Sequence, residues 1–557
     1  MIRFLILLLL ILSVYSARQI HIENHKFVDE LGRTRIYRGQ NAVYKIAPWL
    51  PKSTGFDSTS TLSRIDAKNL QKWGFNVVRL GVMWPGLEPG EQGSYSEEYL
   101  DEVEKIVKIL KDHGISVLLD LHQDLFSRDF CGEGVPKYVV DTCKKYAPEG
   151  MKPFPAPVTT LDRATNTSAI YYDENGYPDL DWCLQTGFFN FYLSEEVSSM
   201  FQCVYDNRDN LWDALGGYWR KVASRFNKMS NVLGYELINE PWLGDIYNDK
   251  SLLLPQQTEK KHLEPMYEHI ATMIREVDED KIIFFEGVTI DYWPSGFSQV
   301  PGGSEYADRS VLAYHIYCPL QEPKPGKLLA CREIDEFYMK QRQKDAERLN
   351  SGLMMTEFGA VLSKVQDMQE METLAQMVDK YQASWMYWQF KQYEDITTIT
   401  PEGETMYSGV GGSLSQQKLR VLSRTYPRAT AGELNSFLFN SRTGVFTMNY
   451  TPVVGQYKLT TEIYFNRDTH YKNGVRFKVN VDHDDASNVG EEVQDLTASV
   501  LEVWFCDANR LDLSYTGNTK STLIVTLEPC SADDKDIMCH CRPDDDDTDG
   551  YARKIAA

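Results

Sequence analysis

Residues 233–242 read LGYELINEPW, a short apolar run that ends in the polar side chains of Asn239 and Glu240. Runs of this kind alternate with longer segments of helical periodicity, which is typical of parallel strands joined by helices. The runs are residues 36–41, 76–80, 116–120, 233–239, 281–286, 311–315, 352–357 and 385–389. Eight such units predict an α/β chain that folds as a (β/α)8 TIM barrel.

Polar side chains stand at or just after the ends of these runs. They are Arg79, Asp120, His122, Asn239, Glu240, His315, Glu357 and Trp388. In a (β/α)8 barrel the carboxyl ends of the strands build the active site. We therefore expect these side chains to gather at one end of the barrel.

The pattern changes after about residue 420 to short alternating runs, such as residues 445–450 and 475–481. Alternation with a period of two predicts a small C-terminal antiparallel β-sandwich. The final stretch is rich in Asp and is typical of a solvated, disordered tail. The expected domains are a signal peptide over 1–17, the catalytic barrel over 18–418, the sandwich over 419–530 and the acidic tail over 531–557.

The first 17 residues, MIRFLILLLLILSVYSA, combine Arg3, an apolar run and small residues, as a secretory signal peptide does. The run is shorter than the about 20 apolar residues that span a bilayer, so cleavage is favoured over a membrane anchor. We expect a secreted protein, either extracellular or lysosomal. The sequons at Asn166 and Asn449 agree with export and predict a glycoprotein.

Ten Cys follow the leader, and an even number in an oxidising compartment predicts disulfides. The pairings that would each close one long loop are Cys131 with Cys143, Cys183 with Cys203 and Cys318 with Cys331, although sequence alone does not determine connectivity. A metal site at Cys539 and Cys541 is a weaker alternative, because a second pair of ligands is missing.

The charge of the chain excludes one class of partner. Its 58 Lys and Arg against 80 Asp and Glu give a net charge of −22. Nucleic-acid binding depends on clustered basic side chains, so we exclude a nucleic-acid partner. An acidic chain would also not bind anionic lipid by electrostatic attraction.

Two carboxylates stand at the expected catalytic face, Glu240 after the fourth strand and Glu357 after the seventh. Hydrolysis of a glycosidic bond with retention needs two carboxyl groups about 5 to 5.5 Å apart, one to protonate the leaving oxygen and one to attack the anomeric carbon. Strand ends four and seven can supply this pair from opposite sides of a barrel.

Motifs around these glutamates carry a resemblance to a known family. They are Asn-Glu-Pro at 239–241, Thr-Glu-Phe-Gly at 356–359, and the segments NVVRLGVMW at 76–84, LLDLHQD at 118–124, YHIYCP at 314–319 and WMYWQF at 385–390. With these motifs the chain resembles glycoside hydrolase family five, a family of retaining (β/α)8 glycosidases. It is most similar to the endoglycoceramidases, because of DLHQD, the segment 41–45 and the long insertion after the third strand.

The resemblance implies roles for the catalytic residues. Glu240 would be the acid/base and Glu357 the nucleophile. Asn239 would bond the sugar 2-hydroxyl, and Arg79 would hold Glu357 ionised. His122, His315 and Tyr317 would line the subsite of the cleaved sugar and Trp388 would form its floor. Sugar hydroxyls would be hydrogen-bonded by Asp120, His122, Asp124 and Lys45. No metal or organic cofactor is implied, since the two carboxylates complete the mechanism.

The function that the resemblance implies is hydrolysis of the bond between oligosaccharide and ceramide in glycosphingolipids by a retaining endo-β-glycosidase. The alternative is a β-glucanase or exo-β-glucosidase of the same family that acts on free saccharides. A carbohydrate-binding protein on an inactive barrel is less favoured, because binding alone needs no catalytic pair. The expected partners are the glycosphingolipid and a transient membrane or micelle surface, with the chain acting as a monomer. Apolar candidates for the lipid side are residues 47–51, 187–191, 242–243 and 292–293.

Overall fold

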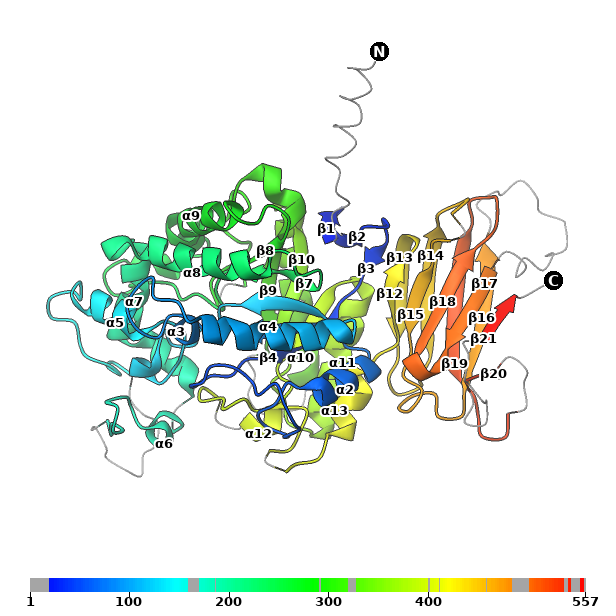
Figure 1. Cartoon of the computed structure of the whole chain (residues 1–557), viewed down its shortest axis with the longest axis horizontal. Coiled ribbons are helices and arrows are strands. Elements are labelled where there is room, and N and C mark those ends of the chain that lie inside the picture. The colour runs from blue at the N-terminus through cyan, green and yellow to red at the C-terminus, as the bar shows by residue number, and fades with distance from the viewer. Residues whose placement is uncertain are drawn as a thin grey trace, which may run out of the picture.

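The computed structural model describes residues 20–158, 170–185, 187–289, 292–318, 327–398, 401–409, 411–456, 458–482, 500–534, 539–541 and 551–554 (Figure 1). The expected signal peptide and the sequon at Asn166 lie outside these residues. No helix in the described part of the chain is both long and apolar enough to cross a membrane.

Eight parallel strands close into a barrel in chain order, which confirms the predicted TIM barrel. They are β4 (Arg38–Ala42), β5 (Val77–Gly81), β6 (Ser116–Asp120), β7 (Val232–Glu236), β8 (Ile282–Glu286), β9 (Ser310–Ile316), β10 (Gly352–Phe358) and β11 (Ser384–Tyr387). Each observed strand overlaps its predicted run. Nearly every side chain of these strands is buried, because helices cover the outside and side chains fill the inside.

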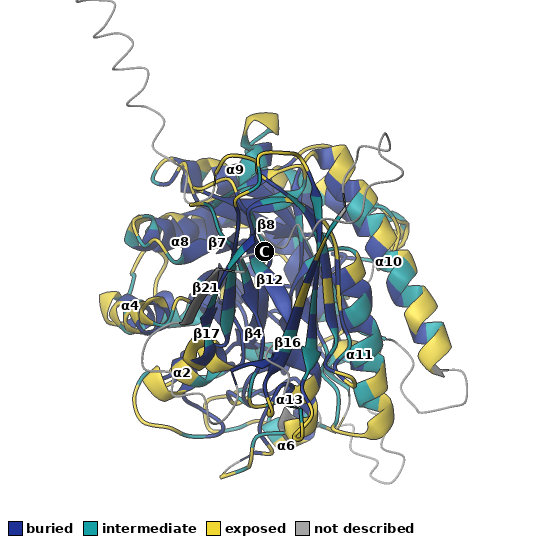
Figure 2. Ribbon diagram, turned by 90° about the vertical axis from the view of Figure 1, so that its right-hand side faces the viewer, coloured by how far each residue is buried: buried dark blue, intermediate teal, exposed yellow. Residues whose placement is uncertain are grey.

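Helices surround the barrel, with buried inner faces and exposed outer faces (Figure 2). They are α2 (Arg64–Lys72), α3 (Trp84–Leu87), α4 (Glu97–Asp112), α8 (Leu211–Phe226), α9 (Glu264–Arg275), α10 (Lys327–Leu349), α11 (Val365–Lys380), α12 (Pro401–Glu404) and α13 (Gln416–Leu422). In α4 the buried residues Leu100, Val103, Val107 and Leu110 recur at helical spacing. The Ser96 hydroxyl caps this helix by accepting from the Tyr99 N–H at 3.1 Å.

The insertion after β6 forms a layer beside one end of the barrel with α5 (Lys137–Lys144), α6 (Leu180–Cys183) and α7 (Glu195–Tyr205). Disulfides Cys131–Cys183 and Cys143–Cys203 cross-link it. The suggested pairings Cys131 with Cys143 and Cys183 with Cys203 were therefore wrong, because packing of α5 against α7 brings together cysteines about 60 residues apart in the chain. The third suggested pairing, Cys318–Cys331, is confirmed.

The C-terminal part forms two antiparallel sheets, as the alternating pattern predicted. One sheet contains β12 (Tyr426–Thr430), β15 (Thr461–Tyr464), β17 (Val500–Phe505) and β18 (Arg510–Tyr515). The other contains β13 (Gly432–Phe439), β14 (Phe446–Pro452), β16 (Val475–Asp482) and β19 (Thr522–Pro529). Aromatic and aliphatic residues fill the space between the sheets.

Both ends of the chain add strands that the expected domain bounds missed. β1 (Ile20–Glu23), β2 (Lys26–Asp29) and β3 (Thr34–Arg35) extend the sheet of β12, although we had placed residues 18–35 in the barrel. Ile22 and Phe27 of this hairpin close the amino end of the barrel by packing against Met354 and Phe284. This apolar contact joins the two domains.

Parts of the expected tail belong to the sandwich. β20 (Cys539–His540) pairs with β16, and the backbone of β21 (Tyr551–Lys554) pairs with β17. Disulfides Cys506–Cys541 and Cys530–Cys539 fix this segment and leave no thiol at either position for the metal alternative. The count of acidic residues had suggested a solvated tail, but the covalent links and strand pairing outweigh that charge.

The sandwich packs on the amino ends of the barrel strands, at the opposite end from the loops that follow the strands (Figure 1). The Tyr464 hydroxyl donates to the Lys72 carbonyl at 2.8 Å, and the Tyr426 hydroxyl donates to the Gly74 carbonyl at 2.8 Å. Gly74 has φ +84°, and a Cβ there would meet the Tyr464 ring at 2.3 Å, so this close approach requires glycine. The contact leaves the carboxyl ends of the strands open.

Candidate active site

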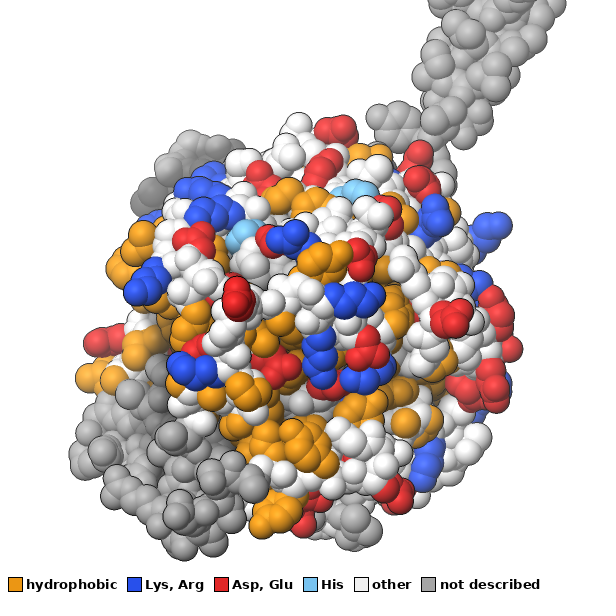
Figure 3. All heavy atoms as spheres, turned by 90° about the vertical axis from the view of Figure 1, so that its left-hand side faces the viewer, with side chains coloured by type: hydrophobic (Ala, Val, Ile, Leu, Met, Phe, Trp, Pro, Cys, Tyr) orange, Lys and Arg blue, Asp and Glu red, His pale blue; other side chains and the backbone are white. Residues whose placement is uncertain are grey.

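A cavity of about 700 Å³ lies at the carboxyl ends of the barrel strands. Figure 3 views the end of the barrel away from the sandwich and shows hydrophobic side chains around a hollow that contains acidic groups. The polar lining includes Lys45, His122, Asp124, Asn239, Glu240, His315, Tyr317, Glu357, Thr397 and Glu404. Trp388 lines the cavity as well, so nine of the eleven predicted site residues meet there. Arg79 and Asp120 are fully buried directly below.

Glu240 lies in the turn after β7. Its carboxylate accepts from the Thr289 hydroxyl at 3.0 Å and is 2.6 Å from His315 Nδ1. Burial raises the pKa of Glu240, and the bond with His315 opposes part of that rise. A carboxyl group with a raised pKa can hold a proton and donate it.

Glu357 is the last residue but one of β10 and lies in a different environment. Arg79 Nη1 donates to one carboxylate oxygen at 2.5 Å, and the Tyr317 hydroxyl donates to the other at 2.7 Å. Two donors on different oxygens fix the orientation of this carboxylate. The two glutamates therefore have different partners: Thr289 and His315 contact Glu240, whereas Arg79 and Tyr317 contact Glu357.

The separation of the two glutamates decides which chemistry they can perform. One carboxylate oxygen of Glu240, one of Glu357 and a ring nitrogen of His315 all lie within 4.8 Å of one another. Pairs that retain anomeric configuration are about 5 to 5.5 Å apart, whereas inverting pairs are about 6.5 to 9.5 Å apart to leave room for water. The close approach of their oxygens fits the retaining class better than the inverting class.

The polar wall of the cavity is a linked set of charges. His122 Nδ1 lies 2.9 Å from Asp120, and Lys45 Nζ donates to Asp124 at 2.5 Å and to the Thr397 hydroxyl at 2.6 Å. Burial opposes the charge on His122, but Asp120 and Asp124 outweigh it and raise its pKa to about 9. These ordered donors and acceptors can bond several sugar hydroxyls.

Trp388 forms part of the same wall. Its ring stacks on His122 with centroids 5.1 Å apart, and Lys45 Nζ lies 4.8 Å from the ring centre. Only 5% of the side chain is exposed, and that part borders the cavity. This position is compatible with the predicted contact with a sugar ring.

Several residues of the site were missing from the sequence prediction. Glu286 ends β8 and could have been found by the same strand-end rule that selected His315 and Glu357. Thr289, Gln123, Glu133, Glu236 and Glu404 gave no comparable signal. Gln123 Nε2 donates to the backbone carbonyls of Asn239 and Glu240, both at 2.8 Å, so this loop residue positions the catalytic turn.

Clusters of His, Cys, Asp and Glu side chains that could bind a metal ion occur in the described residues, and two of them contain a Lys or Arg side chain. Lys45 lies among Asp124 and Glu133, and Arg79 lies among Glu236 and Glu286. The cysteines in two further described groups are disulfide-bonded. In the first two groups the carboxyl oxygens thus face the chain's own cations, Lys45 and Arg79.

Another part of the cavity wall is apolar. Phe188, Phe189, Tyr292 and Tyr338 line it. Of the predicted lipid-side clusters, residues 187–191 and 292–293 contribute here, whereas Trp242 is fully buried core between Tyr192 and Phe189. Leu50 in the cluster 47–51 is also buried, because it packs in the barrel core.

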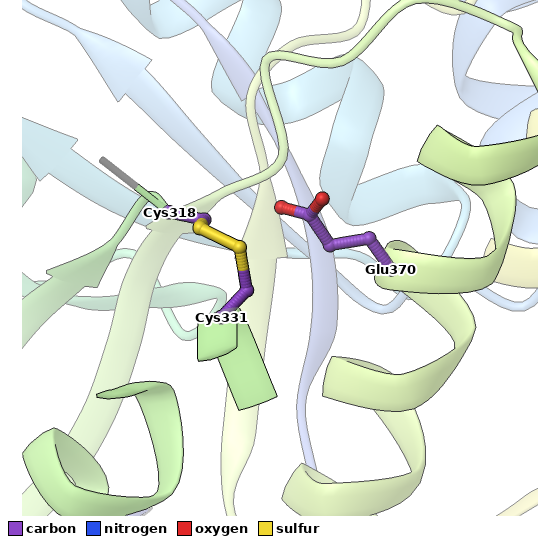
Figure 4. A group of neighbouring side chains, drawn as sticks. All are labelled: Cys318, Cys331 and Glu370. Carbon is purple, nitrogen blue, oxygen red and sulfur yellow. A yellow bond between two sulfur atoms is a disulfide. The ribbon is translucent and has the colours of Figure 1, made fainter. Parts of the chain in front are cut away.

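A disulfide lies beside the cavity (Figure 4). Cys318 lines the cavity next to Tyr317 and is bonded to Cys331 near the start of α10. Glu370 of α11 points toward the sulfur atoms. The disulfide therefore ties the loop that carries Tyr317 to the helix that forms the outer rim of the cavity.

Two family descriptions match the chain. "Cellulase (glycosyl hydrolase family 5)" matches residues 53–394, and "Glycoside hydrolase family 5 C-terminal domain" matches residues 424–502. An endoglycoceramidase of Cyanea nozakii is 38% identical over 81% of this chain and 85% of its own length. An endoglycoceramidase of Hydra vulgaris is 38% identical over 82% of each chain.

Solved structures share the whole fold. Endo-glycoceramidase II from Rhodococcus sp., as its lactosyl-enzyme intermediate, superposes with a TM-score of 0.67 at 21% identity and covers 91% of this chain and 100% of that chain. The same enzyme as a ganglioside GM3 complex gives a TM-score of 0.67 at 20% identity, with coverage of 90% and 99%. At this identity the likeness shows the fold alone, with the barrel and sandwich arranged as one unit.

Proposed function

Since the chain belongs to glycoside hydrolase family 5 and, within it, to the endoglycoceramidases, we propose that it hydrolyses the β-glycosidic bond between an oligosaccharide and ceramide through Glu240 and Glu357. The observation that supports these two residues is their separation, within 4.8 Å, in a cavity with one polar and one apolar wall. The polar wall suits a glycan and the apolar wall suits a lipid.

In the first step Glu240 donates its proton to the oxygen that links sugar to ceramide, while Glu357 attacks the anomeric carbon. The carbon–oxygen bond breaks, ceramide leaves as an alcohol, and a glycosyl ester forms on Glu357. In the second step Glu240 takes a proton from water, which attacks the same carbon and frees Glu357. Two displacements on one carbon retain its configuration.

The surroundings of each glutamate support these roles. Burial keeps a proton on Glu240 before the first step, and His315 can stabilise the carboxylate that the step leaves behind. Arg79 and Tyr317 orient the attacking carboxylate of Glu357. Arg79 also donates to Asn239 Oδ1 at 2.8 Å, and one amide N–H of Asn239 donates to the Gln123 carbonyl at 3.0 Å, so the second N–H is the donor for the sugar 2-hydroxyl.

The substrate is tested by incubating purified protein with a ganglioside, glucosylceramide, a cellooligosaccharide and a mannooligosaccharide, with products identified by mass. The proposal expects an intact glycan and ceramide from the ganglioside. Cleavage of the free oligosaccharides alone would contradict it and favour the β-glucanase alternative.

We also propose that a membrane or micelle surface meets the rim of α10. A groove lined by Tyr292, Ala330, Glu333, Ile334 and Phe337, called here the outer groove, adjoins the catalytic cavity because Tyr292 lines both. The α10 residues recur at helical spacing, so they share one face. Hydrophobic side chains beside the groove are well exposed: Trp293 by 57%, Leu329 by 61% and Phe337 by 46%.

Replacing Trp293, Leu329 and Phe337 together by Ser should reduce hydrolysis of a ganglioside in vesicles by about tenfold or more, because apolar contact worth on the order of 1 kcal/mol per side chain is lost. Hydrolysis of a soluble aryl lactoside should be unchanged, since these side chains are outside the sugar cavity. The two rates are compared in one assay series.

Leu438→Ser is the matched control, because Leu438 is 45% exposed on β13 at the far end of the molecule. It should leave both rates as they are. Equal losses on vesicles and on the soluble substrate in the triple variant would contradict a surface role for the rim. One chain contains both glutamates and the whole cavity, so the proposal requires only a monomer.

We propose that the protein acts outside the cytosol, in the extracellular space or in the lysosome. Five disulfides support export, since such bonds persist in oxidising compartments. Sequencing the amino terminus of protein collected from expressing cells should find a start close to residue 18. A start at Met1 would contradict removal of the leader.

A further inference from the structure

A second pair of carboxyl groups lies below the two catalytic glutamates. Glu236 belongs to β7 and Glu286 ends β8, and both side chains are buried. Oxygen atoms of Glu236 and Glu286 and a ring nitrogen of His315 lie within 4.8 Å of one another. Neither carboxyl group reaches the cavity, so neither can touch the substrate.

Glu286 contacts the acid/base machinery in two ways. One oxygen accepts from the backbone N–H of Glu240 at 3.1 Å, and the other lies 3.2 Å from His315 Nε2. The backbone of Glu240 has φ +39°, which is uncommon for a residue with a side chain and needs support from its surroundings. Glu286 thus contacts both the turn that carries Glu240 and the imidazole that bonds its carboxylate.

The two lower carboxyl groups have different neighbours. Glu236 pairs with Arg79 Nε, and Glu286 is 3.7 Å from Arg79 Nη2 as well as close to His315. Asp120 contributes a further negative charge beside Arg79. The Tyr267 hydroxyl donates to the backbone carbonyl of Glu286. His315 itself also faces Glu357, at 3.6 Å. The carboxyl groups of Glu240, Glu286 and Glu357 therefore surround one imidazole.

Two buried carboxyl groups this close share a proton more readily than they both ionise. Burial, with added repulsion from Asp120 and Glu286, raises the pKa of Glu236 to about 8 although Arg79 opposes the rise. Burial also acts against ionisation of Glu286, but His315 and Arg79 outweigh it and lower its pKa. These two directions favour a proton on Glu236 and a negative charge on Glu286, beside His315.

We propose that Glu286 is a positioning residue that keeps His315 charged and fixes the turn of Glu240, with Glu236 as its protonated partner. The inference rests on the proposed function, because it assigns the acid/base to Glu240. Burial opposes a charge on His315, yet Glu286 and Glu357 outweigh it and raise its pKa well above the usual range. Glu240 and His315 then titrate together as one coupled group.

Glu286→Gln should move the alkaline limb of the kcat/KM profile to lower pH by about one unit, on an aryl lactoside. The amide can still accept from the Glu240 N–H, but the negative charge next to His315 is lost. Removing a nearby negative charge lowers the proton affinity of the coupled group, and a charge within about 4 to 6 Å shifts a pKa by about 1 to 3 units. The acid form of Glu240 is therefore lost at lower pH.

Glu236→Gln is the matched control, because the amide has the shape of the protonated carboxyl group and leaves the charge on Glu286. The alkaline limb of its kcat/KM profile should lie at the same pH as in the parent protein. Equal shifts in the two variants would overturn the assignment of the charge to Glu286. A loss of activity by the same factor at every pH in Glu286→Gln would also overturn the proposal, because it would show a structural role only.

A second measurement does not depend on turnover or on the stability of the variants. In parent protein with ¹⁵N-labelled histidine, the His315 resonance, assigned with His315→Asn, should show an imidazolium at pH 7. A neutral His315 at that pH would overturn the inference even if the enzyme is active. An imidazolium in a protein that cleaves no glycolipid would instead place the failure in the proposed function.

Discussion

Glu357→Gln should abolish hydrolysis of glycolipid, with a loss on the order of 10⁴-fold or more in kcat. The amide has nearly the size of the carboxylate but cannot form the glycosyl ester, because its oxygen is a poor nucleophile. The rate of hydrolysis should fall by a similar factor for substrates with good and with poor leaving groups, since no displacement starts without the nucleophile. Rates on a ganglioside and on an aryl lactoside measure this.

The fold should survive that substitution. Arg79 loses one carboxylate but still contacts Asp120, Glu236 and Glu286, so the buried guanidinium keeps partners. Thermal unfolding and ganglioside binding of Glu357→Gln should therefore resemble those of the parent protein. Normal turnover by a folded Glu357→Gln protein would exclude Glu357 as the nucleophile.

Glu240→Ala should show a loss that depends on the leaving group. Ceramide is a poor leaving group and needs a proton, so its release should slow by about 10²- to 10⁴-fold. A dinitrophenyl leaving group needs no proton, so its release from the same sugar should be much less affected. The hydrolysis of the ester on Glu357 then becomes slow, because no base activates water.

Added azide separates these steps. A small anion fits the space left by the Glu240 carboxylate and attacks the ester without a base, so the dinitrophenyl substrate should turn over faster and yield a β-glycosyl azide. The parent protein should gain nothing from azide, because its carboxylate fills that space. Equal losses for good and poor leaving groups would contradict Glu240 as the acid.

Periodicity predicted the part of the site that lies on strands. Parallel strands of a barrel end at one face, so Glu240, His315 and Glu357 could be brought together from their positions in the sequence alone. Lys45 does not stand at the end of a predicted strand. Only the resemblance of the chain to the family indicated that Lys45 belongs to the site. The structure places its ammonium group 2.5 Å from Asp124, in the expected wall.

Contacts that depend on packing between distant segments could not be predicted in this way. Thr289 contacts Glu240 because of the path that the loop after β8 takes. Glu236 faces Arg79 because the side chains of a barrel strand alternate between the inside and the outside. Disulfide pairing in the insertion depends on how α5 and α7 pack. The hairpin over residues 20–29 gave no sign in its sequence that it closes the barrel and extends the sandwich.

The most direct test of the account follows the digestion of a ganglioside by NMR in D₂O and records the anomeric signal of the glycan as it is released. The separation of Glu240 and Glu357 predicts that the first glycan to appear has the β configuration and that the α form grows later through mutarotation. Initial release of the α form would show inversion and would contradict the catalytic pair.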